Sequence, residues 1–222
     1  MSLRKPCILL LGPTGSGKTT FAKRVGITAS DKPTTQCTAY QVEGLGLTLV
    51  DTPGFSDSPA ETLGVLRIIG KWLGQDSQAV TGVIYFQAIT NGRLTGTARS
   101  HISVFEQICG VSFLSRTVFV TTMWDKLADP GKARYESLHG ELVRKYGRLT
   151  NKGTKFLKFT GDGGSAKEVL GCIEEKSRTS RAAQLQFVKE IKASGLSPTG
   201  VRKTSAGKVV VKDLNRGFCA IL

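Results

Sequence analysis

The sequence feature that most limits the fold is an apolar run that passes into a glycine-rich loop and then a lysine, Leu9–Phe21. Gly12, Gly17, Lys18 and Thr19 have the spacing G-x-x-x-x-G-K-[ST], in which the backbone N–H groups of a loop surround a chain of phosphates. The pattern works only between a strand and a helix. It therefore predicts that the chain begins with a β-strand, a phosphate-binding loop and an α-helix.

Strand-like and helix-like segments alternate along most of the chain. Residues 79–86 form an apolar run typical of a strand, and residues 61–74 have apolar side chains at helical spacing. The alternation predicts an α/β fold with a mainly parallel sheet and helices on both faces, and the phosphate loop makes this a P-loop NTPase. Residues 37–44 and 45–51 indicate a hairpin, further strands are expected at 116–124 and 154–160, and further helices at 100–110, 132–146 and from Ser165.

Charge is distributed unevenly along the 222 residues, whose formal net charge is +14. From Lys176 onward ten Lys or Arg residues face only two acids, Glu190 and Asp213. An excess of this kind favours an anionic partner such as a nucleotide or a lipid headgroup. We expect one nucleotide-binding domain over residues 1–195 and a basic, flexible tail over residues 196–222.

Two features of the sequence concern the place where the chain folds. The five cysteines are scattered without C-x-x-C pairs, so they predict neither a disulfide framework nor a zinc site. Apolar runs are too short for a membrane span or a signal-peptide core. We therefore expect a cytoplasmic protein.

The phosphate loop assigns a role to several of its residues. Gly15 and Gly17 allow backbone amides to approach the phosphates closely. Lys18 is expected to bridge the β- and γ-phosphates and to act in catalysis, and the Thr19 hydroxyl is expected to bind Mg²⁺. The predicted nucleotide-binding residues of this loop are Thr14, Gly15, Ser16, Gly17, Lys18, Thr19 and Thr20.

A second segment, "LTLVDTPGF", supports the same reading. Asp51 ends an apolar strand, from which a carboxylate can hold Mg²⁺ beside the phosphates, usually through water. Gly54 could bring its N–H to the γ-phosphate. By itself "DTPG" indicates only a turn with Pro53 at its second position. Following the lysine loop by some thirty residues, it indicates the other half of a phosphate site.

Taken together these segments resemble the GTPase superfamily, whose motifs include a phosphate loop, a switch threonine and D-x-x-G. The resemblance implies a GTPase G domain that binds GTP or GDP with Mg²⁺. It also implies that one threonine of "KPTTQCTAY" closes over the γ-phosphate and the metal. We expect Thr38, which would then act in catalysis and bind the metal, with Thr35 next and Thr34 as the third candidate.

The base-binding motif departs from the superfamily pattern. Thr122, Met123 and Asp125 occupy positions of [NT]-K-x-D, and Asp125 can accept hydrogen bonds from two donors on guanine that adenine lacks on that edge. Met123 replaces the lysine that normally covers the base, and its thioether can still pack on an aromatic ring. After the last strand, Ser165 and Ala166 match the S-A-[KL] motif, so we expect the Ala166 N–H to reach the guanine oxygen.

The segment Ile89–Gly110 adds a narrower resemblance, in which Arg93 and Thr95 follow a strand. It is similar to septin-like P-loop GTPases, namely the immunity-associated nucleotide-binding and chloroplast import receptor GTPases, and nearest to the small fungal G-domain-containing proteins. The resemblance covers roughly residues 5–170. It implies nucleotide-dependent dimerisation across the nucleotide face, a homodimer to which residues 89–100 contribute.

These observations lead to a GTP-binding switch or slow GTPase. Ras-like enzymes have a water-orienting Gln directly after D-x-x-G, whereas this chain has Phe55, which cannot polarise water. We therefore predict slow hydrolysis, with any acceleration supplied by a dimer partner or by Ser56, Asp57 or a backbone carbonyl. The alternatives are an ATP-dependent kinase of small substrates and a nucleotide-bound membrane- or RNA-binding module that does not hydrolyse.

The chain ends in Cys219-Ala220-Ile221-Leu222, which fits C-a-a-X with the leucine that usually directs geranylgeranylation. Lipidation of Cys219 and the basic residues before it would provide the two signals that stable attachment to an anionic membrane needs. Nucleic acid is not the expected partner, because only Phe187 and Phe218 are interleaved with these basic residues. A free thiol at an apolar chain end is the alternative.

Overall fold

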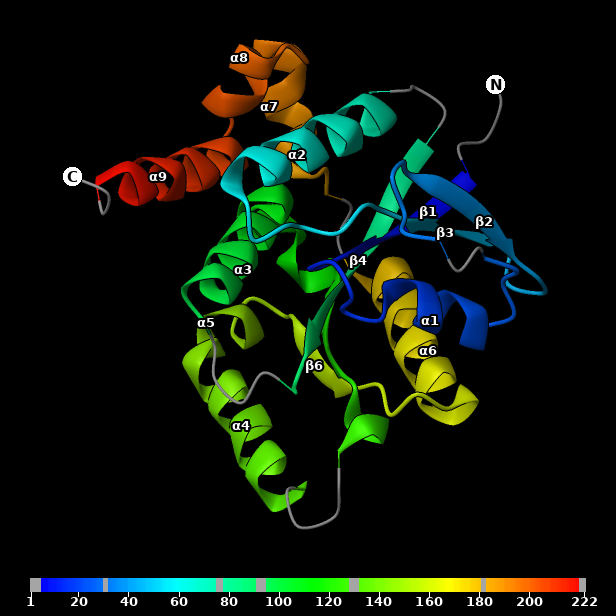
Figure 1. Ribbon diagram of the computed structural model, residues 1–222. Coiled ribbons are helices and arrows are strands. Elements are labelled where there is room, and N and C mark those ends of the chain that lie inside the picture. The colour runs from blue at the N-terminus through cyan, green and yellow to red at the C-terminus, as the bar shows by residue number, and fades with distance from the viewer. Residues whose placement is uncertain are drawn as a thin grey trace.

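The computed structural model describes residues 5–29, 32–74, 78–90, 95–127, 132–180 and 183–219. Within these residues six strands form one sheet in the order β2-β3-β1-β4-β5-β6 (Figure 1). All neighbouring strands are parallel except the β2–β3 hairpin. The strands are β1 (Lys5–Leu11), β2 (Thr38–Val42), β3 (Leu47–Asp51), β4 (Gln78–Ala88), β5 (Thr117–Thr122) and β6 (Lys155–Lys158).

Helices cover both faces of this sheet, and the strand sequences account for it. Residues 7–11 of β1 are all buried, as expected of a central parallel strand with helices on each side. Cys7, Leu9 and Leu11 pack toward α2 (Pro59–Leu73) and α3 (Gly96–Cys109). Ile8 and Leu10 pack toward α1 (Lys18–Arg24) and α6 (Gly163–Thr179). Figure 1 shows these two helix layers on either side of the sheet. The predicted α/β fold with a mainly parallel sheet is confirmed.

The remaining elements of residues 110–158 connect these layers. α4 (Lys132–Lys145) fills the polar helical region predicted for 132–146. Two short 3₁₀ turns flank β5, and the second carries Asp125. These connecting elements are η1 (Val111–Arg116), η2 (Trp124–Lys126) and α5 (Gly147–Thr150).

The C-terminal part of the chain differs from the expected flexible tail. It forms α7 (Gln186–Ser194), α8 (Pro198–Lys203) and α9 (Ser205–Cys219). α9 packs against α2 and α3, as Figure 1 shows at the left of the molecule. The prediction of flexibility was wrong because the apolar residues of this segment recur at helical spacing. Val201, Ala206 and Val210 are buried in the same core as α2 and α3. The domain boundary at residue 195 stays a prediction.

Close packing and hydrogen bonds fix α9 at its start. The Glu190 carboxylate of α7 accepts hydrogen bonds from the Ser205 N–H at 2.7 Å and the Ser205 hydroxyl at 2.6 Å. A Cβ on Gly207 would lie 2.0 Å from the Val201 carbonyl oxygen, so only glycine permits this approach of α9 to α8. In the part of the chain that the structure describes, no helix combines the length and apolar character needed to cross a bilayer.

Candidate functional site

The phosphate loop, residues 12–17, lies at the carboxyl end of β1, where α/β sheets place ligands. Gly12, Gly15 and Gly17 all have positive φ angles, of 146°, 72° and 93°. A Cβ on Gly12 would lie 2.4 Å from the Phe86 carbonyl oxygen on the neighbouring strand β4. These glycines are therefore needed for the path of the loop, as the sequence predicted.

Lys18 lies in the centre of this loop with only 6% of its surface exposed. Its Nζ donates hydrogen bonds to the carbonyl oxygens of Gly12, at 3.1 Å, and Pro13, at 2.9 Å. Burial lowers the pKa of Lys18 to about 8, and the negative charge of Asp51 opposes this shift. A buried ammonium group favours a bound anion, because an anion would offset the desolvation of the charge.

Asp51 supplies the opposite charge at the end of β3 and is 1% exposed. Its Oδ2 accepts hydrogen bonds from the hydroxyls of Thr19, at 2.9 Å, and Thr34, at 2.8 Å. Its Oδ1 is buried and has no hydrogen-bond partner among the described residues. A buried carboxylate oxygen without a hydrogen bond costs free energy unless a ligand or ion contacts it.

These residues fit Mg²⁺. Mg²⁺ prefers oxygen ligands and usually takes only one or two carboxylates, together with waters and the phosphates of a substrate. Asp51 and the Thr19 hydroxyl provide such a set, with an unpartnered oxygen at its centre. No group of three or more His, Cys, Asp or Glu that could hold a metal occurs in the described ranges.

The three candidate switch threonines differ in position. The Thr34 hydroxyl reaches Asp51, whereas Thr35 and Thr38 are exposed. Thr38 begins β2 and pairs through its backbone with Asp51 in the antiparallel ladder. The geometry thus brings Thr34, rather than the favoured Thr38, to the expected metal ligand. The identity of the switch threonine stays a prediction, for which Thr34 is now the first candidate.

The post-β3 loop, residues 52–58, is hydrogen-bonded to the phosphate loop. The Thr14 N–H donates to the Phe55 carbonyl at 3.0 Å, and the Phe55 N–H donates to the Gly12 carbonyl at 3.1 Å. A Cβ on Gly54 would lie 2.4 Å from the Thr14 nitrogen, so glycine is required at this crossing. The structure therefore brings Gly54 to the rim of the phosphate loop, and its contact with the γ-phosphate stays a prediction.

The side chain that follows Gly54 lies away from the phosphate loop. Phe55 is 1% exposed, and its ring centroid is 5.5 Å from that of His101 on α3. The ring is thus part of the hydrophobic core. The expectation that this position cannot orient a water molecule agrees with its burial.

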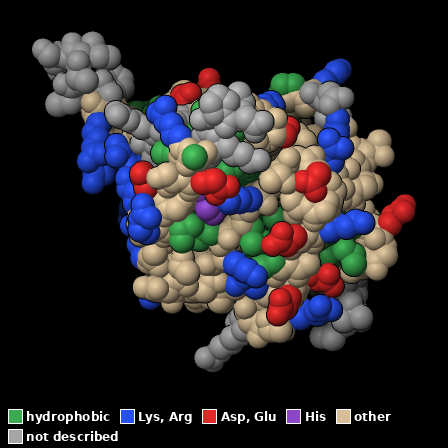
Figure 2. Space-filling view, turned by 90° about the horizontal axis from the view of Figure 1, so that it is seen from below, with side chains coloured by type: hydrophobic (Ala, Val, Ile, Leu, Met, Phe, Trp, Pro, Cys, Tyr) green, Lys and Arg blue, Asp and Glu red, His purple; other side chains and the backbone are tan. Residues whose placement is uncertain are grey.

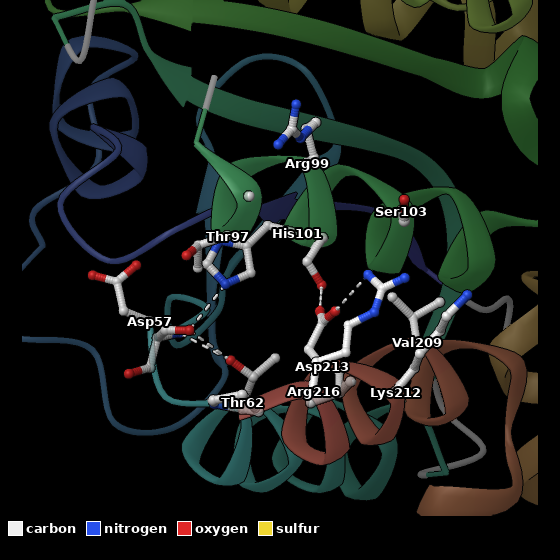
Figure 3. A pocket seen from close by; sticks show the side chains of 15 residues that line it. Asp57, Thr62, Thr97, Arg99, His101, Ser103, Val209, Lys212, Asp213 and Arg216 are labelled. Atoms are coloured by element: carbon white, nitrogen blue, oxygen red, sulfur yellow. Dashed lines mark hydrogen bonds and ion pairs between the residues drawn. The ribbon is translucent and has the colours of Figure 1, made fainter. Parts of the chain in front are cut away.

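A pocket of about 620 Å³ lies between the post-β3 loop, α3 and α9 (Figure 3). The His101 Nε2 lies 2.9 Å from the Ser56 carbonyl oxygen, which can only accept, so Nε2 carries the proton. Burial lowers the pKa of His101, with smaller opposing effects from that hydrogen bond and from Asp57 and Asp213. One residue earlier on α3, the Ser100 hydroxyl donates to the Asp213 carboxylate of α9. The loop, α3 and α9 are therefore joined by adjacent residues, and sequence reasoning missed His101 and Asp213.

On the opposite side of the phosphate loop, Thr122 ends β5. Its hydroxyl donates to the Ser16 carbonyl at 2.8 Å, and its Cβ would lie 3.6 Å from a Cβ on Gly17. Thr122 is 1% exposed. It therefore positions the phosphate loop against β5, a more indirect role than the predicted contact with the nucleotide.

Asp125 lies on η2 with its side chain exposed. Trp124 anchors this turn, because it is buried and its Nε1 donates to the Thr121 carbonyl at 3.2 Å. Met123 enters the turn with a φ of 66°, the only positive φ of a non-glycine residue in the described part of the chain. A Cβ on Gly161 would lie 3.0 Å from the Asp125 Cγ, so Asp125 faces the loop between β6 and α6.

The geometry of that loop does not favour the assignment of Ser165 and Ala166 to the base, which stays a prediction. Asp162 is the N-cap of α6, and its carboxylate accepts from the Ser165 N–H at 2.9 Å. The Ala166 N–H donates to the Asp162 carbonyl at 3.2 Å, and Ala166 is fully buried. Both amides are therefore used by the helix. The structure places Gly161 beside Asp125. The sequence pattern that marks this loop is Asp162 followed three residues later by Ser165, which is typical of a helix N-cap.

Hydrogen bonds within this cap also affect Asp162 itself. The Thr160 hydroxyl and then the Ser165 amide hold the pKa of the Asp162 carboxyl well below its usual range. The loop between β6 and α6 is consequently fixed by an ionised carboxylate at neutral pH.

Some predicted features are outside the described residues. Arg93 is one of them, and so are Ala220, Ile221 and Leu222 of the C-a-a-X motif. Cys219 is the last residue of α9. Its lipidation stays a prediction.

Comparisons with known proteins bear on the fold. No model of a protein family matches the chain, and no curated protein sequence matches it. Among solved structures it is similar to Toc33 from Arabidopsis thaliana in complex with Mg²⁺ and GMPPNP, with 14% identity over 80% of this chain and 86% of Toc33 and a TM-score of 0.59. A dimerisation-deficient mutant of Toc33 gives a TM-score of 0.61 with 13% identity over 81% of this chain and 87% of that one.

A second kind of solved structure is also similar. The elongation factor SelB from Methanococcus maripaludis, in complex with a GTP analogue, matches with 16% identity and a TM-score of 0.53. The match covers 83% of this chain but 36% of SelB. At these identities the likeness concerns the fold. The chain has the α/β P-loop fold of GTPase G domains.

Proposed function

We propose that this protein binds GTP and GDP together with Mg²⁺ and hydrolyses GTP slowly. The observation that carries the proposal is the buried pair Lys18 and Asp51 at the phosphate loop, with one Asp51 oxygen unpartnered among the described residues. Lys18 would contact the β- and γ-phosphates. Asp51 with the hydroxyls of Thr19 and Thr34 would hold Mg²⁺, which neutralises phosphate charge when bound.

Guanine is the proposed base because Asp125 can accept from two neighbouring donors of guanine. Its exposure supports this role, because the carboxylate is accessible to a ligand from solution. Solved proteins of the same fold were crystallised with GDP or GMPPNP and Mg²⁺.

Hydrolysis is proposed to be slow in the isolated chain. The position after Gly54 is a buried phenylalanine, and the Ser56 hydroxyl donates to Glu61. Neither group can hold a water in line with the β–γ bond in this arrangement. We propose that a second copy, facing the nucleotide, accelerates the reaction. In the structurally similar chloroplast translocon components atToc33 and psToc159, dimerisation is important for the GTPase activity. A relation to the septin-like GTPases belongs to the same proposal.

Calorimetric titration with GTP, GDP, ATP and ITP in Mg²⁺ tests the base and phosphate assignments. ITP lacks the exocyclic amine of guanine, so wild-type protein should prefer GTP, by about tenfold or more for a hydrogen bond to a carboxylate. Asp125→Ala should bind GTP and ITP equally. Tight binding of ATP in place of GTP would indicate a kinase and contradict the proposal.

A further inference from the structure

We propose that α8 and α9 present a face that binds the surface of anionic lipid bilayers. The basic face consists of Arg202, Lys203, Lys208, Lys212 and Arg216. All five side chains are exposed. This inference concerns the C-terminal helices and does not depend on which nucleotide the protein binds.

The two acids of the C-terminal helices are already engaged. Glu190 accepts hydrogen bonds from Gln186 and Ser205. Asp213 accepts one from Ser100 and lies 4.0 Å from the Arg216 guanidinium. Over the described residues 183–216 the only other charged side chains are the exposed cations Lys189 and Lys192. The surface of this region therefore carries an excess of positive charge that these two acids do not offset.

One face of α9 is buried and the other faces solvent. Ala206, Gly207 and Val210 are buried where α9 meets its neighbours. Lys208, Lys212 and Arg216 follow one another at intervals of four residues, so they form a row along the solvent side of the helix. In Figure 2 Lys and Arg side chains gather along the left edge of the molecule, the side on which Figure 1 shows α9.

This arrangement favours contact with headgroups over insertion. The apolar stripe of α9 is used inside the protein, and the solvent side offers only the half-buried Val211 between its cations. A basic helix face of this kind is attracted to an anionic leaflet within about one Debye length, and salt weakens the attraction. The binding should therefore be peripheral and reversible.

A bilayer fits this face better than single-stranded RNA. Proteins that bind single strands interleave aromatic side chains with basic ones, on which the bases stack. Among the described residues 183–216 the only aromatic is Phe187, which is fully buried. The side chain of Phe218 is outside the described part of the chain. The described surface thus offers charge without a stacking platform.

The test is co-sedimentation of the full chain, produced without lipid modification, with vesicles of phosphatidylcholine alone or with about 30% phosphatidylserine. Wild-type protein should bind the anionic vesicles at low salt and release them in about 0.5 M salt. It should not bind the neutral vesicles. Each Lys or Arg near the leaflet raises the binding constant for the vesicles about fivefold. Lys208→Gln with Lys212→Gln should thus weaken binding about 25-fold.

Lys145→Gln with Lys152→Gln is the matched control. It removes the same number of exposed cations from α4 and the turn after α5. Its binding should stay within about twofold of wild type, since these cations do not belong to the basic face. Equal losses in both variants would overturn the proposal in favour of a general effect of net charge. Absence of binding to anionic vesicles at low salt would also overturn it, and so would single-stranded RNA binding more tightly than vesicles and depending on Lys208 and Lys212.

Discussion

The phosphate side and the base side of the proposed nucleotide site are built in different ways. On the phosphate side one continuous segment supplies the glycines, Lys18 and Thr19, and buried hydrogen bonds tie it to Asp51 and the post-β3 loop. On the base side Asp125 is exposed and meets a loop that follows about 35 residues later, at Gly161. Phosphate recognition is local and buried, whereas base recognition depends on how two separate loops are placed.

This difference explains why the motifs match unevenly. A loop that binds through backbone N–H groups needs glycines at fixed positions, so its sequence varies little. A base contact needs only one carboxylate at the right place. The fold can position that carboxylate even though Met123 stands where the motif has lysine. It can do so also where the loop before α6 contains the N-cap Asp162 three residues ahead of Ser165.

The largest effect should come from the phosphate side. Asp51→Asn keeps the size of the side chain and its acceptor for Thr19, but it removes the charge that attracts Mg²⁺. Losing a group that orients or supports a metal costs about 10–100-fold in metal affinity. Titration of GTP with Mg²⁺ and with EDTA should show a large Mg²⁺ effect in wild-type protein and little in the variant.

Asp57→Asn is the control for this measurement, because Asp57 is an exposed carboxylate of the same post-β3 loop. It should keep the full Mg²⁺ effect. If Asp51→Asn also kept that effect, the metal assignment would be wrong and the comparison between the two sides would lose its basis.

A smaller effect should appear with pH. Burial lowers the pKa of Lys18 to about 8, so the free protein loses this charge as the pH rises above about 8. Bound phosphate needs the ammonium form. Above that pKa binding must therefore take up a proton, and affinity falls by up to about tenfold for each pH unit. From about pH 7 to about pH 9 the affinity for GTP should drop about tenfold.

Inorganic tripolyphosphate, which has no base, separates the two sides in this experiment. It should also lose affinity as the pH rises through the pKa of Lys18, because the effect belongs to that residue. If only the affinity for GTP fell, the titrating group would instead lie on the base side.

The smallest effect should come from Gly161→Ala on the base side. Gly161 has a φ of 87°, and a Cβ there would lie 3.0 Å from the Asp125 Cγ. The left-handed backbone costs a side-chain-bearing residue about 1–2 kcal/mol, which urea unfolding should detect. Displacement of Asp125 should also reduce the preference for GTP over ITP several-fold.

Gly163→Ala provides the comparison, since a Cβ on Gly163 would meet nothing within 4 Å. Gly163 begins α6, and alanine there should stabilise the protein by up to about 1 kcal/mol. The preference for GTP should not change. If both variants and wild-type protein preferred GTP over ITP to the same extent, Gly161 would have no role in base recognition.

The strands, most helices and the phosphate loop could be read from the sequence because their signals are local. Residues 7–11 form an apolar run and residues 117–122 a run of β-branched and aromatic side chains; both are buried, and such strands need no knowledge of their neighbours to be identified. The C-terminal helices were missed because the charges of α9 hide the spacing of Ala206 and Val210. That apolar stripe has meaning only once α2 and α3 provide a surface for it.

The α/β fold and the residues expected to meet phosphate can be predicted from local sequence, because a phosphate loop needs glycine, lysine and threonine at fixed intervals. The contact of Thr34 with Asp51 and the position of Gly161 beside Asp125 become visible only in the folded chain. Each of these contacts joins segments far apart in the chain. Their distances depend on the order of the strands and the packing of the helices, which no local pattern records.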